Sequence, residues 1–199
     1  MDPCERCRKP ANVCVCDRCE RVPCGVTVLV LQHPQEEDRV LGTVPLLEAV
    51  VGAERRVGLS WANLAAARGG PTEGRWAVVW PQQLPEGAPV PEAGQVLHLD
   101  RAGKPTDEKL EGIVLLDGSW SQGKALWWRN AWLLKLDRVV LAPKEPSIYG
   151  RLRREPRPTW VSTLEAAADT LEALGEPEET RGALRRAMRT MVQRARDAG

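Results

Sequence analysis

The chain has 199 residues, of which 43% are hydrophobic, and its formal net charge is +1. This length and composition predict one domain with a buried core and a small appendage. No apolar run reaches ~18 residues, so we expect no membrane-spanning segment and no membrane partner. The N-terminus is charged and rich in cysteine rather than apolar, so we expect no signal peptide and a cytoplasmic protein.

Short apolar runs alternate with helical patterns along the chain, and this alternation predicts an α/β fold. The expected strands cover residues 26–32, 56–59, 76–80, 95–99, 113–116 and 138–141. One helix is expected to start at Pro45, and others to cover residues 120–134, 163–174 and 177–196. Segments 81–94 and 142–160 are expected to be loops, and the length of the second indicates a function.

All six cysteines lie in the first 24 residues, which in a cytosolic chain indicates a metal site rather than disulfides. Two closely spaced pairs supply the four soft ligands that Zn²⁺ prefers: Cys4 with Cys7, and Cys14 with Cys16. A rival ligand set consists of Cys16, Cys19, Cys24 and one earlier thiol, and a redox role or an iron–sulfur cluster is the weaker alternative. We expect residues 1–24 to form a small zinc-binding segment that the metal stabilises.

Polar residues directly follow two of the expected strands. Asp117 comes after the apolar run 113–116, Gly118 allows a tight turn, and Ser119 can cap the tryptophan-rich helix that follows. His33 comes directly after the first strand. Because ligands of open α/β sheets bind at the carboxyl ends of the strands, this edge is the expected functional site. The alternative is that Asp117 and Ser119 only cap a helix and that His33 is structural.

Two further features lie in the C-terminal third of the chain. Ser162 or Thr163 can cap the next helix, and Glu165 can complete a capping box, which by itself needs no further function. Arginines gather at Arg151, Arg153, Arg154 and Arg157, and again along the last helix. Such clusters suit phosphate backbones, although they are also common as solvated faces.

Four motifs follow one another over nearly the whole chain. They are Cys-x2-Cys-x6-Cys-x-Cys-Asp from Cys4 to Asp17, His-Pro-x-Glu-x2-Arg-x3-Thr from His33 to Thr43, Asp-Gly-Ser-Trp from Asp117 to Trp120, and Ser-Thr-Leu-Glu-Ala from Ser162 to Ala166. In this order they resemble the DTW-domain proteins, which are tRNA-uridine aminocarboxypropyltransferases related to SPOUT-like methyltransferases. The family's Asp-x-Thr-Trp is Asp-Gly-Ser-Trp here, and Gly123 stands where an Ala is usual.

The resemblance implies a SPOUT-like, mostly parallel sheet flanked by helices, with a knotted chain, over residues 25–199. It implies transfer of the 3-amino-3-carboxypropyl group of S-adenosylmethionine to N3 of a tRNA uridine, which releases methylthioadenosine. A carboxylate at a strand end can accept the N3 proton. Asp117 is expected in this role, with binding of the ammonium or ribose of S-adenosylmethionine as its alternative.

The resemblance also implies the residues of the site. The expected catalytic residues are Asp117, Ser119 and Trp120. The expected residues that bind S-adenosylmethionine are His33, Pro34, Glu36, Thr43, Ser162, Thr163 and Glu165. The expected tRNA-binding residues are Arg39, Arg151, Arg153, Arg154 and Arg157. The expected Zn²⁺ ligands are Cys4, Cys7, Cys14 and Cys16.

Two other functions compete with this one. A SPOUT-like RNA methyltransferase would bind the same co-substrate and transfer its methyl group instead. A non-catalytic, zinc-dependent RNA-binding protein would explain the cysteines and arginines, but not the polar residues at the strand ends. The sequence leaves open which tRNA and uridine are used, and whether the protein is a monomer or a homodimer.

Overall fold

The protein folds around one β-sheet, and the computed structural model describes residues 3–79, 86–153 and 160–198. Within these residues the sheet has six strands in the order β2–β1–β5–β3–β6–β4. The strands are β1 (Thr27–Gln32), β2 (Glu54–Val57), β3 (Trp76–Val79), β4 (Val96–Leu99), β5 (Gly112–Asp117) and β6 (Asp137–Leu141). Neighbouring strands are parallel, except that β4 runs antiparallel to β6 at one edge. The predicted α/β fold with a mostly parallel sheet is therefore confirmed, whereas the SPOUT-like knot stays a prediction.

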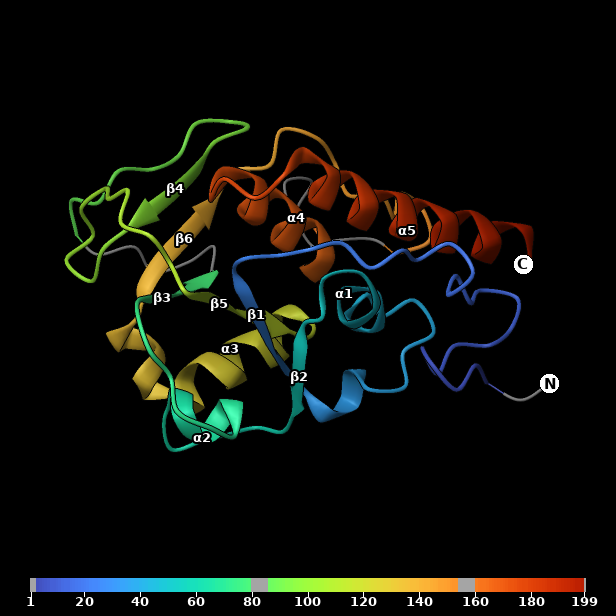
Figure 1. The fold of residues 1–199 in the computed structure, drawn as a ribbon, viewed down its shortest axis with the longest axis horizontal. Helices are drawn as coiled ribbons and strands as arrows, with labels where there is room; N and C mark the ends of the chain where they lie inside the picture. Colours follow the sequence, from blue (N-terminus) through green and yellow to red (C-terminus); the bar gives the residue numbers. More distant parts are fainter. Residues whose placement is uncertain (1–2, 80–85, 154–159, 199) are drawn as a thin grey trace.

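β1 and β5 are neighbours in the middle of the sheet and are buried along most of their length (Figure 1). Strands that are covered on both faces have continuous apolar runs, which explains the apolar stretches 28–31 and 113–116. The register of the two strands pairs Gln32 with Asp117, so both strands end at the same level. The polar residues that follow them consequently meet at one edge of the sheet.

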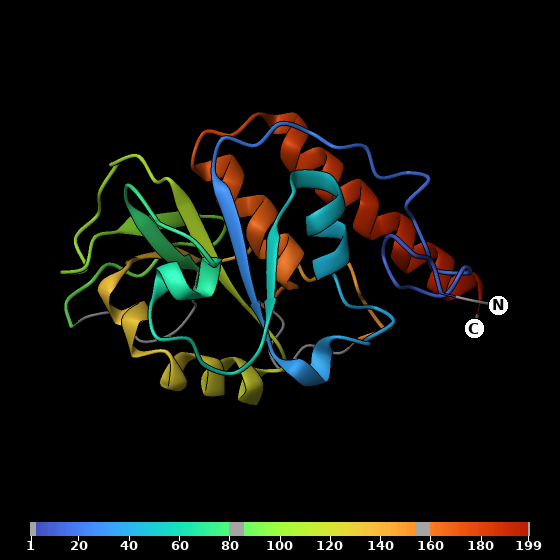
Figure 2. The same ribbon diagram turned by 60° about the horizontal axis from the view of Figure 1, so that its bottom comes forward.

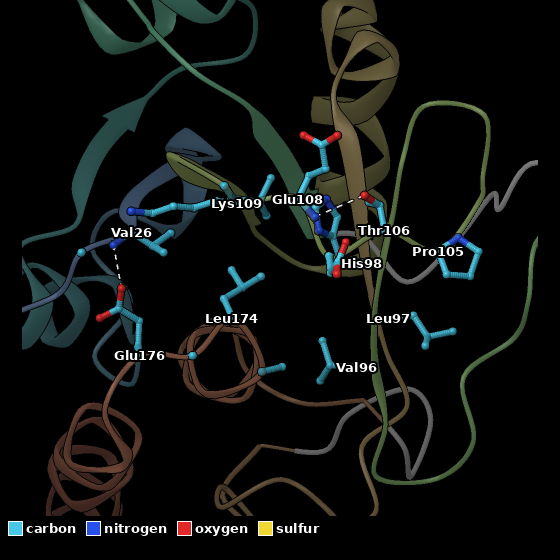
Figure 3. Close-up of a pocket in the computed structure, with 15 residues that line it drawn as sticks. Val26, Val96, Leu97, His98, Pro105, Thr106, Glu108, Lys109, Leu174 and Glu176 are labelled. Atoms are coloured by element: carbon cyan, nitrogen blue, oxygen red, sulfur yellow. Dashed lines mark hydrogen bonds between the residues drawn. The ribbon is translucent and has the colours of Figure 1, made fainter.

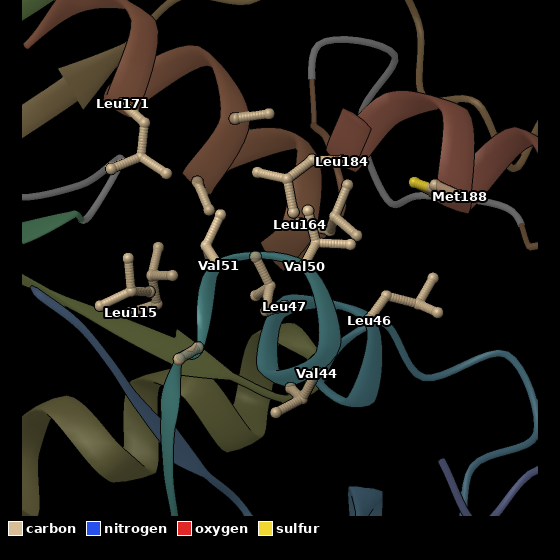
Figure 4. Packing of buried hydrophobic residues seen from close by; sticks show 14 of the residues in the cluster. Val44, Leu46, Leu47, Val50, Val51, Leu115, Leu164, Leu171, Leu184 and Met188 are labelled. Atoms are coloured by element: carbon tan, nitrogen blue, oxygen red, sulfur yellow. The ribbon is translucent and has the colours of Figure 1, made fainter. Parts of the chain in front are cut away.

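Helices cover both faces of the sheet (Figure 2). One face carries α1 (Val44–Val51), α4 (Thr163–Ala173) and α5 (Glu178–Asp197), and the other carries α2 (Leu64–Arg68) and α3 (Trp120–Arg129). On the first face Leu47 and Leu164 belong to the same buried cluster as Leu115 of β5 (Figure 4). On the second face Trp127 of α3 packs in a cluster with Val114. The predicted flanking helices are thus confirmed.

The helix expected over residues 120–134 is interrupted in the structure. α3 ends just before Asn130, and a 3₁₀ helix, Ala131–Lys135, follows. The Nδ2 atom of Asn130 donates hydrogen bonds to the carbonyls of Leu126, at 2.7 Å, and Leu59, at 3.0 Å. The side chain thus satisfies a carbonyl that the helix end leaves without a backbone donor, and it ties this end to the segment before α2.

Two smaller elements differ from the expectations. The strand expected over residues 56–59 lies two residues too late, because β2 is a polar edge strand without a strong apolar signal. Helix α2 is not predicted by the sequence pattern. Its start is capped by Asn63, whose Oδ1 accepts a hydrogen bond from the Ala66 amide at 2.8 Å. The helix ends at Arg68, and Gly69 follows as its C-cap residue with a φ of 81°. An Asn before and a Gly after the alanines are thus the signal that the sequence offers for α2.

The N-terminal segment lies along α1 and the C-terminal half of α5 (Figure 1). Val15 and Cys19 belong to the same buried cluster as the residues of α1, α4 and α5. Arg194 of α5 donates two hydrogen bonds to the Asp17 carboxylate, at 2.9 and 2.8 Å. The segment therefore packs on the main core, and the division into domains 1–24 and 25–199 stays a prediction.

Some expectations are not tested by the structure. Residue 80 of the third expected strand and residues 81–85 and 154–159 of the two expected loops lie outside the described residues. Among the helices of the described part of the chain, none is both long and apolar enough to cross a bilayer. The cytoplasmic location and the choice between a monomer and a homodimer stay predictions.

Candidate functional site

Asp117 lies at the carboxyl end of β5, where three distant segments of the chain meet. Its Oδ2 accepts a hydrogen bond of 2.8 Å from Nε2 of Gln32, and its Oδ1 accepts one of 2.6 Å from Oγ1 of Thr163. The residue is only 9% exposed. Each carboxylate oxygen has two lone pairs, so each can accept a further hydrogen bond or a proton from a ligand. These donors come from β1 and α4. The hydrogen bonds of the Asp117 carboxylate therefore do not support a role as a cap of α3.

The start of α4 is built to hold Thr163 against Asp117. Ser162 is the N-cap residue: its Oγ accepts a hydrogen bond from the Glu165 amide at 3.2 Å, and the Glu165 carboxylate accepts one from the Ser162 amide at 3.0 Å. This is the capping box that the sequence predicts. Thr163 is the first residue of α4, so the cap fixes the place of its hydroxyl group.

Glu165 also anchors the loop that follows β6. The residue is 1% exposed, and its carboxylate accepts hydrogen bonds from Oγ of Ser147, at 2.6 Å, and from the Ile148 amide, at 2.8 Å. These contacts, with those to Ser162, support a structural role for Glu165. A direct contact of Ser162 or Glu165 with S-adenosylmethionine stays a prediction.

The segment after β1 borders the same edge of the sheet. The His33 amide donates to the Asp117 carbonyl at 2.9 Å, and Nδ1 of His33 caps the 3₁₀ helix Pro34–Glu36 by accepting from Gln35. Glu36 is 6% exposed, and its carboxylate lies 3.6 Å from Nε of the exposed Arg39. The backbone of His33 is therefore held beside Asp117, and contacts within the segment fix the residues from Pro34 to Arg39 that follow it.

Thr43 ends this segment as the N-cap residue of α1, and it is 2% exposed. The carbonyls of the three residues before it all accept hydrogen bonds from side chains. Nζ of Lys9 donates to the carbonyls of Val40, at 2.7 Å, and Gly42, at 2.6 Å, and the Tyr149 hydroxyl donates to that of Leu41. Lys9 of the N-terminal segment and Tyr149 thus hold residues 40–42 of the His33 motif, directly before α1.

Lys9 is a buried residue near this site that the sequence patterns do not mark. Its exposed fraction is 2%, and burial lowers its pKa to about 8. The negative charges of Cys7 and Asp117 act in the other direction and raise this pKa. A buried lysine is rare without partners, and here two backbone carbonyls serve as partners. No pattern in the sequence marks this residue, because its partners are more than 30 positions away, with separations of 31 and 33 residues.

Lys9→Met is expected to destabilise the fold, because two carbonyls lose their donor. Each acceptor left without a partner in the interior costs about 1–3 kcal/mol. The measurement is the free energy of unfolding from urea titrations. Lys104→Met is the matched control, since Lys104 is exposed in the turn after β4 and should change stability by less than about 0.5 kcal/mol. Equal stability of the two variants would contradict the assigned role of Lys9.

Ser119 and Trp120 also lie at this edge, where α3 begins. The Ser119 amide donates to Oε1 of Gln122 at 2.5 Å, and Nε2 of Gln122 donates to Oε1 of Gln35 at 3.0 Å. Gln122 therefore joins the start of α3 to the His33 motif. The Trp120 ring packs on Trp160, with ring centres 4.3 Å apart. The predicted catalytic residues are thus brought together, while their roles stay predictions.

The four predicted metal ligands form one cluster. The Sγ atoms of Cys4, Cys7, Cys14 and Cys16 all lie within 4.8 Å of one another. The Sγ–Sγ distance is 3.8 Å between Cys4 and Cys16, and 3.5 Å between Cys7 and Cys14. A tetrahedron with metal–sulfur bonds of about 2.3 Å has edges of about 3.8 Å, so the cluster fits a metal with tetrahedral thiolate coordination.

The electrostatics of the thiols agree with this fit. Several hydrogen bonds lower the pKa of Cys4 to about 6, and the one from the backbone of Cys7 has the largest effect. The lowered pKa favours the thiolate, which is the form that binds metals. Burial raises the pKa of Cys7 and Cys16 because it disfavours their thiolates. A bound cation would offset this loss of solvation. Cys24 lies apart, with its Sγ 3.2 Å from the Val26 carbonyl, so the rival ligand set receives no support.

The expected basic residues are in part described by the structure. Arg151 is exposed, and the guanidinium of Arg153 lies 5.5 Å from the centre of the Tyr149 ring. Arg154 and Arg157 lie outside the described residues. On α5, the arginines at positions 181, 185 and 194 form ion pairs with carboxylates, which reduces the charge that they can offer to phosphates. The sequence could not show this pairing.

A cavity of about 580 Å³ lies at the opposite edge of the sheet (Figure 3). Its lining includes Val26 and Leu110, which precede β1 and β5, and Leu174 at the end of α4. Asp117 lies at the other end of β5, so this cavity is not part of the predicted site.

The sequence of the chain matches a known family. The DTW domain family matches residues 1–196, and the chain belongs to this family. The relatives that it resembles carry the name "tRNA-uridine aminocarboxypropyltransferase 2". The chain is 30% identical to the mouse protein over 86% of its own length, and 30% identical to the Drosophila melanogaster protein over 98%. It spans about half (56%) of the mouse relative and 76% of the fly relative. No solved structure matches the chain.

Proposed function

We propose that this protein transfers the 3-amino-3-carboxypropyl group of S-adenosylmethionine to N3 of a tRNA uridine. The name of its relatives supports the reaction class. The observation that carries the proposal is the position of Asp117, whose carboxylate is held by Gln32 and Thr163 at the carboxyl edge of the sheet. This edge is where ligands bind in open α/β folds.

The chain's own residues have two tasks in this reaction: they accept a proton and they orient the group that accepts it. S-adenosylmethionine supplies a carbon that is activated by its bond to a sulfonium. Asp117 accepts the proton of uridine N3 while the new bond from N3 to carbon forms and the bond from carbon to sulfur breaks, so methylthioadenosine leaves. Gln32 and Thr163 keep the carboxylate oriented toward the nucleobase. Positioning of this kind supplies much of the rate enhancement in displacement reactions.

The segments on both sides of Asp117 are the proposed binding site of S-adenosylmethionine. The His33 motif, from His33 through Glu36 to Thr43, borders one side, and the start of α4 at Thr163 borders the other. Both segments are fixed by buried contacts, and a site of this kind needs little reordering when a ligand binds. The thiol cluster is proposed to hold Zn²⁺ as a structural ion, because four cysteine ligands leave no open position for a substrate.

The function is tested by mass spectrometry of nucleosides from tRNA treated with the protein and S-adenosylmethionine. A uridine that carries the aminocarboxypropyl group, with release of methylthioadenosine, is the expected result. A methylated uridine with release of S-adenosylhomocysteine would instead identify a methyltransferase. Binding of tRNA without any modified nucleoside would favour the non-catalytic RNA-binding alternative. Asp117→Asn serves as the control protein.

Replacement of Arg151 and Arg153 together by Gln is expected to raise KM for tRNA more than KM for S-adenosylmethionine. Each lost phosphate contact should lower the slope of log affinity against log salt by about 0.7–0.9. Arg101→Gln is the matched control. Arg101 is exposed in the turn after β4, and the chain then enters β5 at the end of that strand opposite to Asp117. If tRNA affinity and its salt dependence match those of Arg101→Gln, these two arginines only form a solvated face.

A further inference from the structure

α3 carries a stripe of two tryptophans with a lysine between them. Trp120, Lys124 and Trp128 are four residues apart, so they lie on one face of the helix. The ammonium of Lys124 lies 5.3 Å from the centre of the Trp120 ring, which packs on Trp160. We call Trp120, Lys124 and Trp128 the α3 stripe. It begins three positions after Asp117 and extends for ~12 Å along the helix.

Trp128 is the exposed end of this stripe. It is 67% exposed, whereas its neighbour Trp127 is 3% exposed and packs against the sheet. A tryptophan can bury roughly 150–250 Å², so a side chain left in water contributes little of this to folding. The exposed ring therefore leaves an aromatic face on which the group of a partner can stack.

The charges around the stripe point to an anionic partner. Between Asp117 and Asp137 the chain contains Lys124, Arg129 and Lys135 and no acidic residue. Lys124 and Arg129 are exposed beside the tryptophans. This contrasts with α5, where three arginines are paired with carboxylates. Aromatic rings interleaved with cations are the surface that binds unpaired nucleotides, because bases stack on the rings and phosphates contact the cations.

The chemistry of the reaction defines the form of RNA that reaches this surface. N3 lies on the Watson–Crick edge of uridine and is engaged whenever the base is paired. A uridine that reacts at N3 is therefore unpaired, and its neighbours in a loop expose base faces that aromatic side chains can cover. The α3 stripe starts at the edge that holds Asp117, so a strand placed there would continue along α3.

We propose that the α3 stripe binds the single-stranded RNA next to the target uridine, with one unpaired base stacked on Trp128. Lys124 and Arg129 contact the adjacent phosphates. The proposal relies on the proposed function for the identity of the RNA, but its binding test does not require catalysis. It assigns the recognition of the loop to α3, in addition to any phosphate contacts made by Arg151 and Arg153.

The test measures the affinity of the whole protein for a fluorescent RNA hairpin that has a uridine in its loop. Trp128→Ala should weaken binding by between about 5-fold and 150-fold, because one stacked base is lost. Trp128→Phe should retain most of the affinity, since an aromatic face remains. Val90→Ala, which truncates another exposed apolar side chain, is the control and should bind as the unmodified protein does.

The cationic part of the stripe has its own measurement. Lys124→Gln should lower the slope of log affinity against log salt by about 0.7–0.9, whereas Trp128→Ala should leave the slope unchanged. Lys104→Gln removes an exposed lysine in the turn after β4 and should have no effect. A fully paired RNA duplex of the same length should bind without dependence on Trp128.

Three results would overturn the proposal. Hairpin affinity and kcat/KM for tRNA that stay unchanged in Trp128→Ala would show that α3 does not contact the RNA. Dissociation of a dimer by Trp128→Ala in sedimentation experiments would assign this face to a second copy of the chain. Binding of the protein to anionic lipid vesicles but not to RNA, with loss of vesicle binding in Trp128→Ala, would assign Trp128 to a membrane surface. Hairpin binding that depends on Trp128, with no modified nucleoside, would contradict only the proposed reaction.

Discussion

Asp117→Asn is expected to lower the rate of transfer by about 10²–10⁴-fold, with little change in the affinity for S-adenosylmethionine. The substitution preserves the size of the side chain and one hydrogen-bond acceptor while it removes the group that takes the N3 proton. The rate is measured by product formation under saturating tRNA, and the affinity by calorimetry with S-adenosylmethionine alone. These two readouts separate the roles that Asp117 can have.

If Asp117 holds the ammonium or ribose of S-adenosylmethionine instead, the affinity should fall together with the rate. If both are close to those of the unmodified protein, Asp117 is not catalytic. Thr163→Val is the matched variant, because it removes the 2.6 Å hydrogen bond to Asp117 and leaves the carboxylate in place. Its rate should fall less than that of Asp117→Asn, through a lower kcat, while the stability should change little because the capping box of Ser162 and Glu165 is not altered.

Cys7→Ser should abolish stoichiometric metal binding and destabilise the N-terminal segment. Structural zinc sites contribute about 10–16 kcal/mol of metal-binding free energy at neutral pH, and this energy also stabilises the folded segment. Metal content is measured by elemental analysis of the purified protein, and the expected value is one zinc ion per chain. Cys19→Ser is the matched control, because both thiols are buried and only Cys7 belongs to the cluster.

Loss of the metal should also loosen the segment next to the predicted site. Lys9 lies between the two cysteine pairs in the sequence and holds the carbonyls of Val40 and Gly42. Amide hydrogen exchange in residues 39–43 should therefore become faster in Cys7→Ser but not in Cys19→Ser. Full metal retention in Cys7→Ser, or metal loss in Cys24→Ser, would show that a different set of thiols binds the ion.

Some features of this protein follow from short stretches of its sequence. The buried strands β1 and β5 are apparent in continuous apolar runs, and the cap of α4 is apparent in the pattern from Ser162 to Glu165. The two cysteine pairs predict the thiol cluster, because residues so near in sequence can meet in one short loop. These predictions succeed because the interactions that decide them are local. Elements with weak local signals, such as the polar edge strand β2, were misplaced.

The sequence by itself thus determined the strands other than β2, the helices other than α2, the family and the thiol cluster. Only the tertiary structure decided which side chains surround Asp117, since Gln32 and Thr163 are 85 and 46 positions away from it. It also decided that Lys9 holds the loop before α1, and that three arginines of α5 are neutralised by carboxylates. Contacts between distant segments depend on the register of the sheet and on how the helices pack, and no local periodicity of the sequence records either of them.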